Sequence, residues 1–192
     1  MGNKTGEKEW LVESGNAQIG RQEDERIDTI RKLKDGETDL LKDFLYEAIF
    51  IPEGAEPPER EIVEKPELRV YTDGFGTRRG DNCLVADVDG KIIGAVWTRI
   101  MNDYGHVDDD TPSFAISLYK EYGGKGIGTA LMRRMLELLK EQGYRKASLA
   151  VQKANYAVRL YEKLGFRTVS ENAEEYIMVC NIDKVKESAL CL

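Results

Sequence analysis

The segment Gly123-Gly124-Lys125-Gly126-Ile127-Gly128 is the part of the sequence best suited to binding an anion, because it places four glycines within six residues. Glycine has no Cβ, so its backbone can approach an anion closely and turn its N–H groups toward it. A helix is expected to begin here, and the first N–H groups of a helix have no partner within it. Residues 124–129 therefore form a candidate cradle for a diphosphate, with Lys125 as a nearby positive charge.

The glycine cluster alone leaves a second interpretation open, since a plain tight turn into a helix uses the same residues. Two common phosphate motifs do not fit. A P-loop needs a glycine, four further residues and then Gly-Lys-Ser or Gly-Lys-Thr, which is not found here. The dinucleotide pattern G-x-G-x-x-G fails because Thr129 stands where its third glycine should be, and because the turn lies in the C-terminal half.

A second segment gives the cradle a specific interpretation. Residues 155–166 read Asn-Tyr-Ala-Val-Arg-Leu-Tyr-Glu-Lys-Leu-Gly-Phe. Together with the glycine segment, and at the spacing seen here, they resemble the two cofactor-contacting segments of the GNAT superfamily of acyl-CoA N-acyltransferases. The family pattern Gln/Arg-x-x-Gly-x-Gly/Ala falls on Gly123, Gly126 and Gly128, so Gly123 replaces the usual Arg or Gln. We expect this replacement to weaken coenzyme binding without abolishing it, with Lys125 as a substitute contact.

The resemblance, which covers about residues 27–182, implies a single α/β domain with a mixed central sheet of about seven strands and four flanking helices. It implies acetyl-CoA as the cosubstrate and direct attack by an amine within a ternary complex. In the family, the strand before the glycine segment splays from its neighbour and its backbone holds the pantetheine; an ordinary buried strand is the alternative. The residues assigned to the coenzyme are Ile116, Leu118, Gly123, Gly124, Lys125, Gly126, Ile127, Gly128, Thr129 and Asn155.

Tyr161 is the candidate catalytic residue. A phenol, with a pKa of about 10, is protonated near neutral pH and can give its proton to a departing thiolate. The resemblance places Tyr161 where GNAT enzymes often keep this general acid. The alternative is a core tyrosine that packs its helix onto the sheet. Asn155 is expected to cap the same helix, to contact the coenzyme, or to do both.

The base that would deprotonate the amine is left open by the sequence. The candidates are Glu47, His106 and the three aspartates Asp108, Asp109 and Asp110, although each is also an ordinary surface residue type. Trp97 and Tyr104 are candidates for the wall of an acceptor pocket, which we expect to be built by residues 49–79 and 102–112. The acidic run favours a cationic acceptor, either a small molecule or a peptide amine.

Composition narrows the functional classes. The net charge of −7 disfavours a nucleic-acid binder, and we find no apolar run long enough for a membrane span or a signal peptide. One histidine and three cysteines without metal-like spacing predict neither a metal site nor disulfides, which favours a cytoplasmic protein. A homodimer is expected only from the resemblance. Two rival functions are a non-catalytic acyl-CoA sensor and an enzyme that binds a nucleotide phosphate.

Periodicity and turn chemistry predict the elements that must position these residues. Residues 1–22 and 183–192 are expected to be tails around a domain of residues 23–182. Thr38 is expected to cap the first helix, and Asp89-Gly90 to form a type I′ hairpin turn. The predicted strands are residues 27–33, 83–88, 91–101, 113–119, 146–151, 166–169 and 175–181. The predicted helices are residues 40–49, 127–142 and 155–164, with short helical turns at 59–65 and 67–71.

Overall fold

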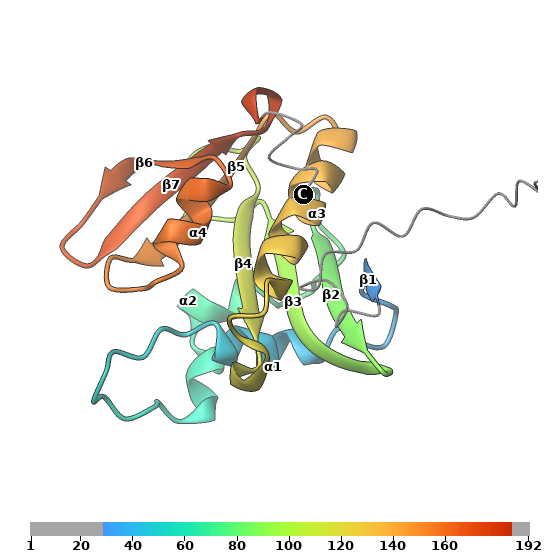
Figure 1. Cartoon of the computed structure of the whole chain (residues 1–192), viewed down its shortest axis with the longest axis vertical. Coiled ribbons are helices and arrows are strands. Elements are labelled where there is room, and N and C mark those ends of the chain that lie inside the picture. The colour runs from blue at the N-terminus through green and yellow to red at the C-terminus, as the bar shows by residue number, and fades with distance from the viewer. Residues whose placement is uncertain (1–28, 186–192) are drawn as a thin grey trace, which may run out of the picture.

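The computed structural model describes residues 29–185, which form a seven-stranded mixed sheet in the order β1-β2-β3-β4-β5-β7-β6 (Figure 1). The strands are β1 (Thr29–Lys32), β2 (Asn82–Val88), β3 (Lys91–Arg99), β4 (Ser113–Leu118), β5 (Lys146–Gln152), β6 (Phe166–Glu171) and β7 (Glu175–Asn181). All neighbouring pairs are antiparallel except β4 and β5, which are parallel. The predicted order of strands and helices is confirmed.

Four α-helices lie around the sheet. They are α1 (Leu40–Glu47), α2 (Pro66–Arg69), α3 (Ile127–Glu141) and α4 (Val158–Lys163), with short 3-10 turns η1 (Arg60–Glu64), η2 (Lys120–Tyr122) and η3 (Ile182–Lys184). The apolar positions of α3 recur at helical spacing, so they fall on one face and are buried against β2, β3 and β4. The opposite face of the sheet is covered by α1, which packs its buried residues with those of β2 and β3.

The hairpin between β2 and β3 forms as predicted. Asp89 and Gly90 have φ values of +53° and +78°, as a type I′ turn requires. Gly94 of β3 lies at an irregularity in this hairpin. Opposite it the register slips between Ala86 and Asp87, and a Cβ on Gly94 would lie 2.8 Å from the Leu118 side chain. The β3 backbone therefore approaches β4 closely at Leu118.

The two halves of the sheet separate between β4 and β5. β4 pairs with β3 along its whole length, whereas its pairing with β5 is limited to Ser113 opposite Ser148. Figure 1 shows the two strands diverging, with β5, β7 and β6 turned away from the β1–β4 half. The rest of β4 therefore has no strand partner on its β5 side.

Some local expectations need correction. Thr38 does not cap α1, because the capping position is Asp39 and no side chain bonds the helix end. The glycine segment does not follow β4 directly, since η2 intervenes. The predicted first strand, residues 27–33, begins outside the described residues. The tail predicted at residues 1–22 lies entirely outside them. Within the described part of the chain, no helix has the length and apolar character that crossing a bilayer would demand.

Candidate active site

The N-terminus of α3 presents a row of unpaired backbone donors. Gly124 and Gly126 have φ values of +74° and +82°, in the left-handed region that favours glycine. The N–H of Ala130 donates to the Gly126 carbonyl at 3.0 Å. Among the described residues, none accepts a hydrogen bond from the six N–H groups of residues 124–129. Because Gly124 and Gly126 are exposed, this row is open to an anion.

Lys125 and Gly123 are both bonded to η2, the 3-10 turn that precedes them. The Lys125 ammonium donates to the Glu121 carbonyl at 2.8 Å and lies 5.1 Å from the centre of the Tyr122 ring. Its charge is thus held beside η2. Gly123 is exposed, and its N–H donates to the Lys120 carbonyl at 3.1 Å. The donors that remain for an anion are therefore those of residues 124–129.

The backbone of β4 continues from this turn into the gap beside β5. The Tyr119 N–H donates to Ile93 of β3, and backbone directions alternate along a strand, so the polar groups of Leu118 and Ile116 point away from β3. A Cβ on Gly128 would lie 3.3 Å from the Leu118 side chain, so α3 packs directly against this part of β4. Both β4 residues assigned to the coenzyme therefore turn backbone donors and acceptors toward the gap.

A cavity of about 290 Å³ opens where β4 and β5 separate. Of the residues predicted for the site, Ile116, Asn155 and Tyr161 line it, whereas Leu118 and the glycine turn lie outside it. The remaining wall is largely apolar. It comes from α1 and the segment that follows it, from η1 and α2, and from β4 and β5: Leu45, Ala48, Ile49, Phe50, Ile62, Leu68, Phe114, Ala115, Leu149, Ala150 and Val151.

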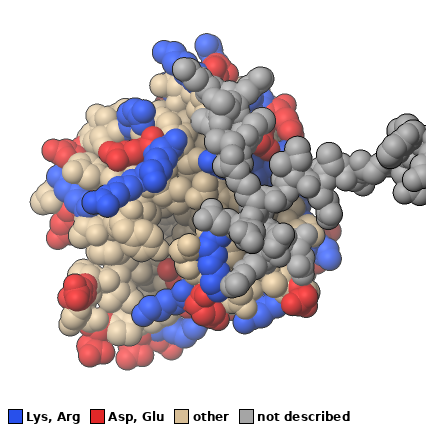
Figure 2. All heavy atoms as spheres, viewed as in Figure 1, with Lys and Arg blue, Asp and Glu red and all other residues tan. Residues whose placement is uncertain are grey.

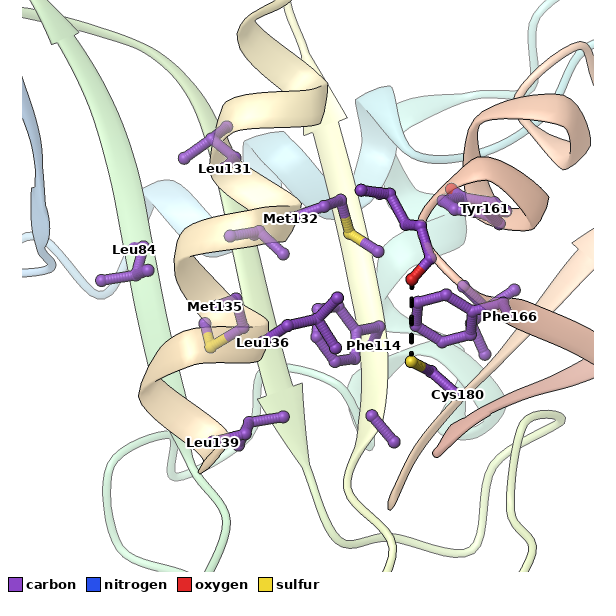
Figure 3. Packing of buried hydrophobic residues seen from close by; sticks show 14 of the residues in the cluster. Leu84, Phe114, Leu131, Met132, Met135, Leu136, Leu139, Tyr161, Phe166 and Cys180 are labelled. Atoms are coloured by element: carbon purple, nitrogen blue, oxygen red, sulfur yellow. Dashed lines mark hydrogen bonds between the residues drawn. The ribbon is translucent and has the colours of Figure 1, made fainter. Parts of the chain in front are cut away.

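Tyr161 combines a packed ring with a place on the cavity wall. Its side chain comes from α4 and lies beside Phe166, with ring centres 6.1 Å apart, as Figure 3 shows. Phe166 in turn contacts Phe114 edge-on at 5.8 Å. Burial raises the pKa of Tyr161, so the phenol keeps its proton throughout the neutral range. The packing role and the acid role are thus compatible in one residue.

Asn155 shapes the turn that leads into α4. Its side-chain oxygen accepts a hydrogen bond from the Ala157 N–H at 2.9 Å, which closes an Asx turn. The helix begins at Val158, later than predicted, and Asn155 is not its capping residue. Asn155 also lines the cavity, where it can contact a bound ligand.

None of the base candidates from the sequence lines the cavity. Glu47 is exposed at the end of α1, and the His106 ring nitrogen Nδ1 lies 2.9 Å from the Met101 carbonyl. Asp108 and Asp110 form ion pairs with Lys146 and Arg79, and the Asp109 side chain is almost fully exposed. Trp97 is completely buried in the cluster beneath α1, so only Tyr104 of the two aromatic candidates lines the cavity.

Three polar residues on the cavity wall were missed by the sequence reasoning: Tyr71, Gln152 and Glu175. Glu175 lies opposite Gln152 in the β5–β7 register, and the Gln152 amide donates to its carboxylate at 3.2 Å. The Tyr71 hydroxyl donates to Asp103 at 2.9 Å. These residues come from separate loops and strands, so no local motif marks them. As predicted, segments 49–79 and 102–112 both contribute to the wall.

The face that carries α3 and α4 also presents positive charge. In Figure 2 uncharged residues occupy much of the middle of this face, and Lys and Arg side chains lie over α4 and β6. Arg159, Lys163 and Arg167 line a shallow hollow there together with one acid, Glu162, so the hollow has a net positive charge. Although the net charge is −7, this region can attract an anionic ligand. Among the described residues, no group of His, Cys, Asp and Glu is arranged to hold a metal ion.

Comparison with known proteins agrees with this geometry. N-acetyltransferase 8 of Mus musculus is 28% identical over 122 residues, which are 62% of this chain and 54% of the mouse protein. The chain thus spans about half the length of this curated relative. Among solved structures, a PaiA N-acetyltransferase from Thermoplasma acidophilum in complex with coenzyme A has a TM-score of 0.60 at 22% identity. That match covers 80% of this chain and 98% of the other.

A spermidine/spermine N-acetyltransferase SpeG from Vibrio cholerae matches with a TM-score of 0.57 at 22% identity, over 84% of this chain and 97% of that one. The two structural matches confirm the predicted fold of a mixed seven-stranded sheet with four helices. A model of the acetyltransferase (GNAT) family matches residues 45–166. That match spans more than half of the sequence, and the chain therefore belongs to the GNAT acetyltransferase family.

Proposed function

We propose that this protein transfers the acetyl group of acetyl-CoA to a primary amine, which attacks the thioester directly within a ternary complex. The observation that carries the proposal is a continuous path of polar backbone groups. It starts at the unpaired N–H groups of residues 124–129, passes Leu118 and reaches Ile116 on the cavity wall. Tyr161 lines the same cavity, where a thiol leaving group would need a proton.

Each part of this path has a role in the proposal. The N–H row and the α3 dipole bind the diphosphate, and the β4 backbone at Ile116 and Leu118 holds the pantetheine arm and the thioester carbonyl. Tyr161 gives its proton to the thiolate as the carbon–sulfur bond breaks. Asn155, beside Tyr161, contacts the coenzyme while its side-chain oxygen keeps the Asx turn.

Direct attack is favoured over an acyl-cysteine intermediate because the cysteine thiols of the described residues are buried and stay protonated near neutral pH. Cys83 and Cys180 are buried and neither lines the cavity. Burial raises the pKa of Cys180 to about 12 and also raises that of Cys83. Neither thiol forms an appreciable amount of the nucleophilic thiolate near neutral pH. Cys191 lies outside the described residues.

The cavity favours a cationic acceptor. Glu175 lines the wall, and none of the described lining residues is lysine or arginine. Tyr71 and Tyr104 add aromatic rings, whose faces attract ammonium groups. The acidic run that suggested a cation in the sequence is instead engaged elsewhere, with Asp108 and Asp110 in ion pairs. The solved SpeG relative is named for spermidine and spermine, so polyamines belong in the first set of acceptors to test.

The function is tested by incubating the full chain with acetyl-CoA and a panel of amines that includes spermidine, amino acids and short peptides. We expect consumption of acetyl-CoA with at least one amine. Thermal unfolding with coenzyme A, NAD and ATP separates the rival functions, because only a true ligand raises the melting temperature appreciably. Stabilisation by coenzyme A without turnover of any amine would favour an acyl-CoA sensor, and stabilisation by NAD or ATP alone would favour a nucleotide-binding enzyme.

Gly126→Ala should weaken coenzyme A binding by at least about tenfold, because loss of one charge-assisted hydrogen bond already costs that much. Gly126 has φ +82°, and no atom lies within 4 Å of the position a Cβ would take. That space is on the side where the diphosphate is proposed to bind. Calorimetric titration with coenzyme A measures the effect.

Gly36→Ala is the matched control. Gly36 has φ +87° and equally open space around its Cβ position, but it lies in the turn before α1, which borders the C-terminal part of α3 at Leu138 and not the glycine segment. Both variants should lose about 1–2 kcal/mol of unfolding free energy, which is the cost of alanine in the left-handed region. Equal loss of coenzyme affinity in both would show that Gly126 matters only for stability.

A further inference from the structure

At the cavity wall, Tyr71 and a partly buried acid form a hydrogen-bonded pair that has no role in the chemistry proposed above. The Tyr71 hydroxyl donates to Asp103 Oδ2 at 2.9 Å, and the Ser113 hydroxyl donates to the same oxygen at 2.7 Å. Tyr71 lines the cavity, whereas Asp103 does not. A ligand that contacts the Tyr71 hydroxyl in the cavity is therefore linked to the acid through this hydrogen bond.

The direction of this hydrogen bond leaves the Tyr71 oxygen as an acceptor for a ligand in the cavity. Because the Tyr71 proton points at the carboxylate, the phenol oxygen turns its remaining lone pairs toward other donors. Burial and the negative charges of Asp103 and Glu175 raise the pKa of Tyr71, so it stays a neutral phenol. Burial raises the pKa of Asp103, although the hydrogen bonds from Ser113 and Tyr71 act in the opposite direction. Asp103 is thus a better proton acceptor than a solvated aspartate.

Arg99 holds Tyr71 in place from outside the cavity. Its guanidinium donates to the Val70 carbonyl at 2.9 Å and to the Asp73 carbonyl at 2.7 Å, on either side of Tyr71. The same guanidinium is anchored by a fully buried ion pair with Asp81. A group that takes part in proton transfer needs such fixed geometry, since small displacements are costly in rate.

An amine acceptor arrives as an ammonium ion and must lose a proton before it can attack. We propose that Tyr71 accepts this proton while it passes its own proton to Asp103, an inference that rests on the proposed amine acetylation. An N–H bond of the ammonium breaks as an O–H bond forms on Tyr71. The original O–H bond of Tyr71 breaks as Asp103 Oδ2 gains the proton. The ammonium becomes a neutral amine, the carboxylate becomes a neutral acid, and the phenol is unchanged.

The apolar residues that make up most of the wall support this transfer, because away from Glu175 they disfavour a charged nitrogen and favour the neutral amine. Glu175, the other acid at the cavity, has its two carboxylate oxygens engaged by Gln152 at 3.2 Å and Asn172 at 3.4 Å. It attracts the cation and holds it. Tyr71 is thereby the group that contacts the reacting nitrogen, and Asp103 is a positioning residue that acts through it.

The kinetic test compares ethylamine, which is mostly protonated near neutral pH, with 2,2,2-trifluoroethylamine, which has the same carbon skeleton with a bulkier terminal group and is mostly neutral. Each variant is compared with the unsubstituted protein on the same amine, so the difference in size between the amines cancels. Tyr71→Phe should lower kcat/KM for ethylamine by about tenfold to 10²-fold, since water can replace the relay in part. The loss with trifluoroethylamine should be several times smaller, because that amine has no proton to lose before attack. Asp103→Asn should show the same pattern.

Tyr46→Phe is the matched control, because the Tyr46 hydroxyl donates to the Pro58 carbonyl at 2.7 Å and does not line the cavity. It should leave both rates unchanged. An equal loss with both amines in Tyr71→Phe would overturn the relay and leave Tyr71 a packing residue. A large loss for ethylamine in Glu175→Gln, without one in Tyr71→Phe, would assign the proton to Glu175 and also overturn it.

A second measurement needs no turnover and so separates this inference from the proposed function. Carbon-13 NMR of labelled aspartates follows the titration of Asp103, whose signal is identified by its loss in Asp103→Asn. We expect a pKa above the ordinary aspartate range. Tyr71→Phe should raise it further, because the phenol hydrogen bond stabilises the carboxylate. An ordinary pKa, or one that Tyr71→Phe does not move, would overturn the inference even if amines are acetylated.

Discussion

Replacing Tyr161 by phenylalanine should lower kcat by about 10²–10⁴-fold, the usual contribution of a general acid, while the affinity for coenzyme A stays nearly unchanged. The substitution removes only the hydroxyl. The ring stays packed against Phe166 and inside the core that Tyr161 shares with α3 and β5. The thiolate must then leave without a proton, or take one from water. Steady-state kinetics with a turned-over amine, together with coenzyme A titration, measures both quantities.

Burial adds a pH dependence to this prediction. A general acid works only while it is protonated, and burial raises the pKa of Tyr161. On the alkaline side the unsubstituted enzyme should therefore keep its kcat beyond the ordinary pKa of tyrosine, about 10. Tyr161→Phe should not show the fall in kcat at high pH that deprotonation of the Tyr161 phenol would cause.

Tyr144→Phe serves as the control for Tyr161→Phe. Tyr144 is partly buried, whereas Tyr161 is buried; it follows α3 and contacts Arg79, 5.8 Å from its ring centre, on a surface away from the cavity. It should retain full activity. If Tyr161→Phe were as active as this control, Tyr161 would be a packing residue and the acid would have to come from elsewhere.

The features predicted correctly from the sequence are those that depend on neighbours in the chain. The hairpin at Asp89-Gly90 requires two residues that tolerate positive φ, and both stand next to each other. The helix of α3 follows from apolar spacing that ends at Gly143, which has φ +84°. The open row of N–H groups at residues 124–129 follows from the same local rules.

The acceptor side of the cavity depends on contacts between distant segments, so the sequence predicted the contributing segments and Tyr104 but not Tyr71, Gln152 or Glu175. Tyr71 meets Asp103 across 32 positions of the chain. Glu175 reaches the cavity because β7 pairs with β5 in one particular register, which no local pattern specifies. His106 and the aspartates near it were candidates for the base because of their residue types. In the structure His106 contacts Met101, and Asp108 and Asp110 form ion pairs with Lys146 and Arg79. Residue type alone therefore predicts the functional residues of a cavity poorly when contacts between distant segments decide which residues line it.

Arg99→Met should lower the free energy of unfolding by about 3–5 kcal/mol, the cost of leaving a buried charge without its partner. The side chains of Arg99 and Asp81 are fully buried, with Nε and Oδ1 2.7 Å apart, and the guanidinium also donates to the carbonyls of Val70 and Asp73. Methionine fills much of the volume but offers no donor. Chemical denaturation at neutral pH measures the loss. Arg99→Lys keeps the charge but lacks the planar guanidinium group, so its free energy of unfolding should lie between those of Arg99→Met and the unsubstituted protein.

The sign of the pH dependence separates loss of the ion pair from simple loss of packing. Burial opposes ionisation of Asp81, but the hydrogen bonds from Arg99 and from the backbone N–H of Arg78 outweigh it, so its pKa lies below the ordinary value. The stability that this carboxylate contributes is present above its unfolded pKa and is lost as the pH falls. The cost of Arg99→Met should therefore shrink toward acidic pH, where Asp81 can be buried neutral. Asp81→Leu combined with Arg99→Met should recover much of the lost unfolding free energy at neutral pH, since an apolar pair needs no counter-charge. The alternative is that the loss in Arg99→Met is the same at every pH and is not reduced in the double variant. In that case the packing of the Arg99 side chain, and not its charge, would hold residues 70–81, and Tyr71 with them, against β3.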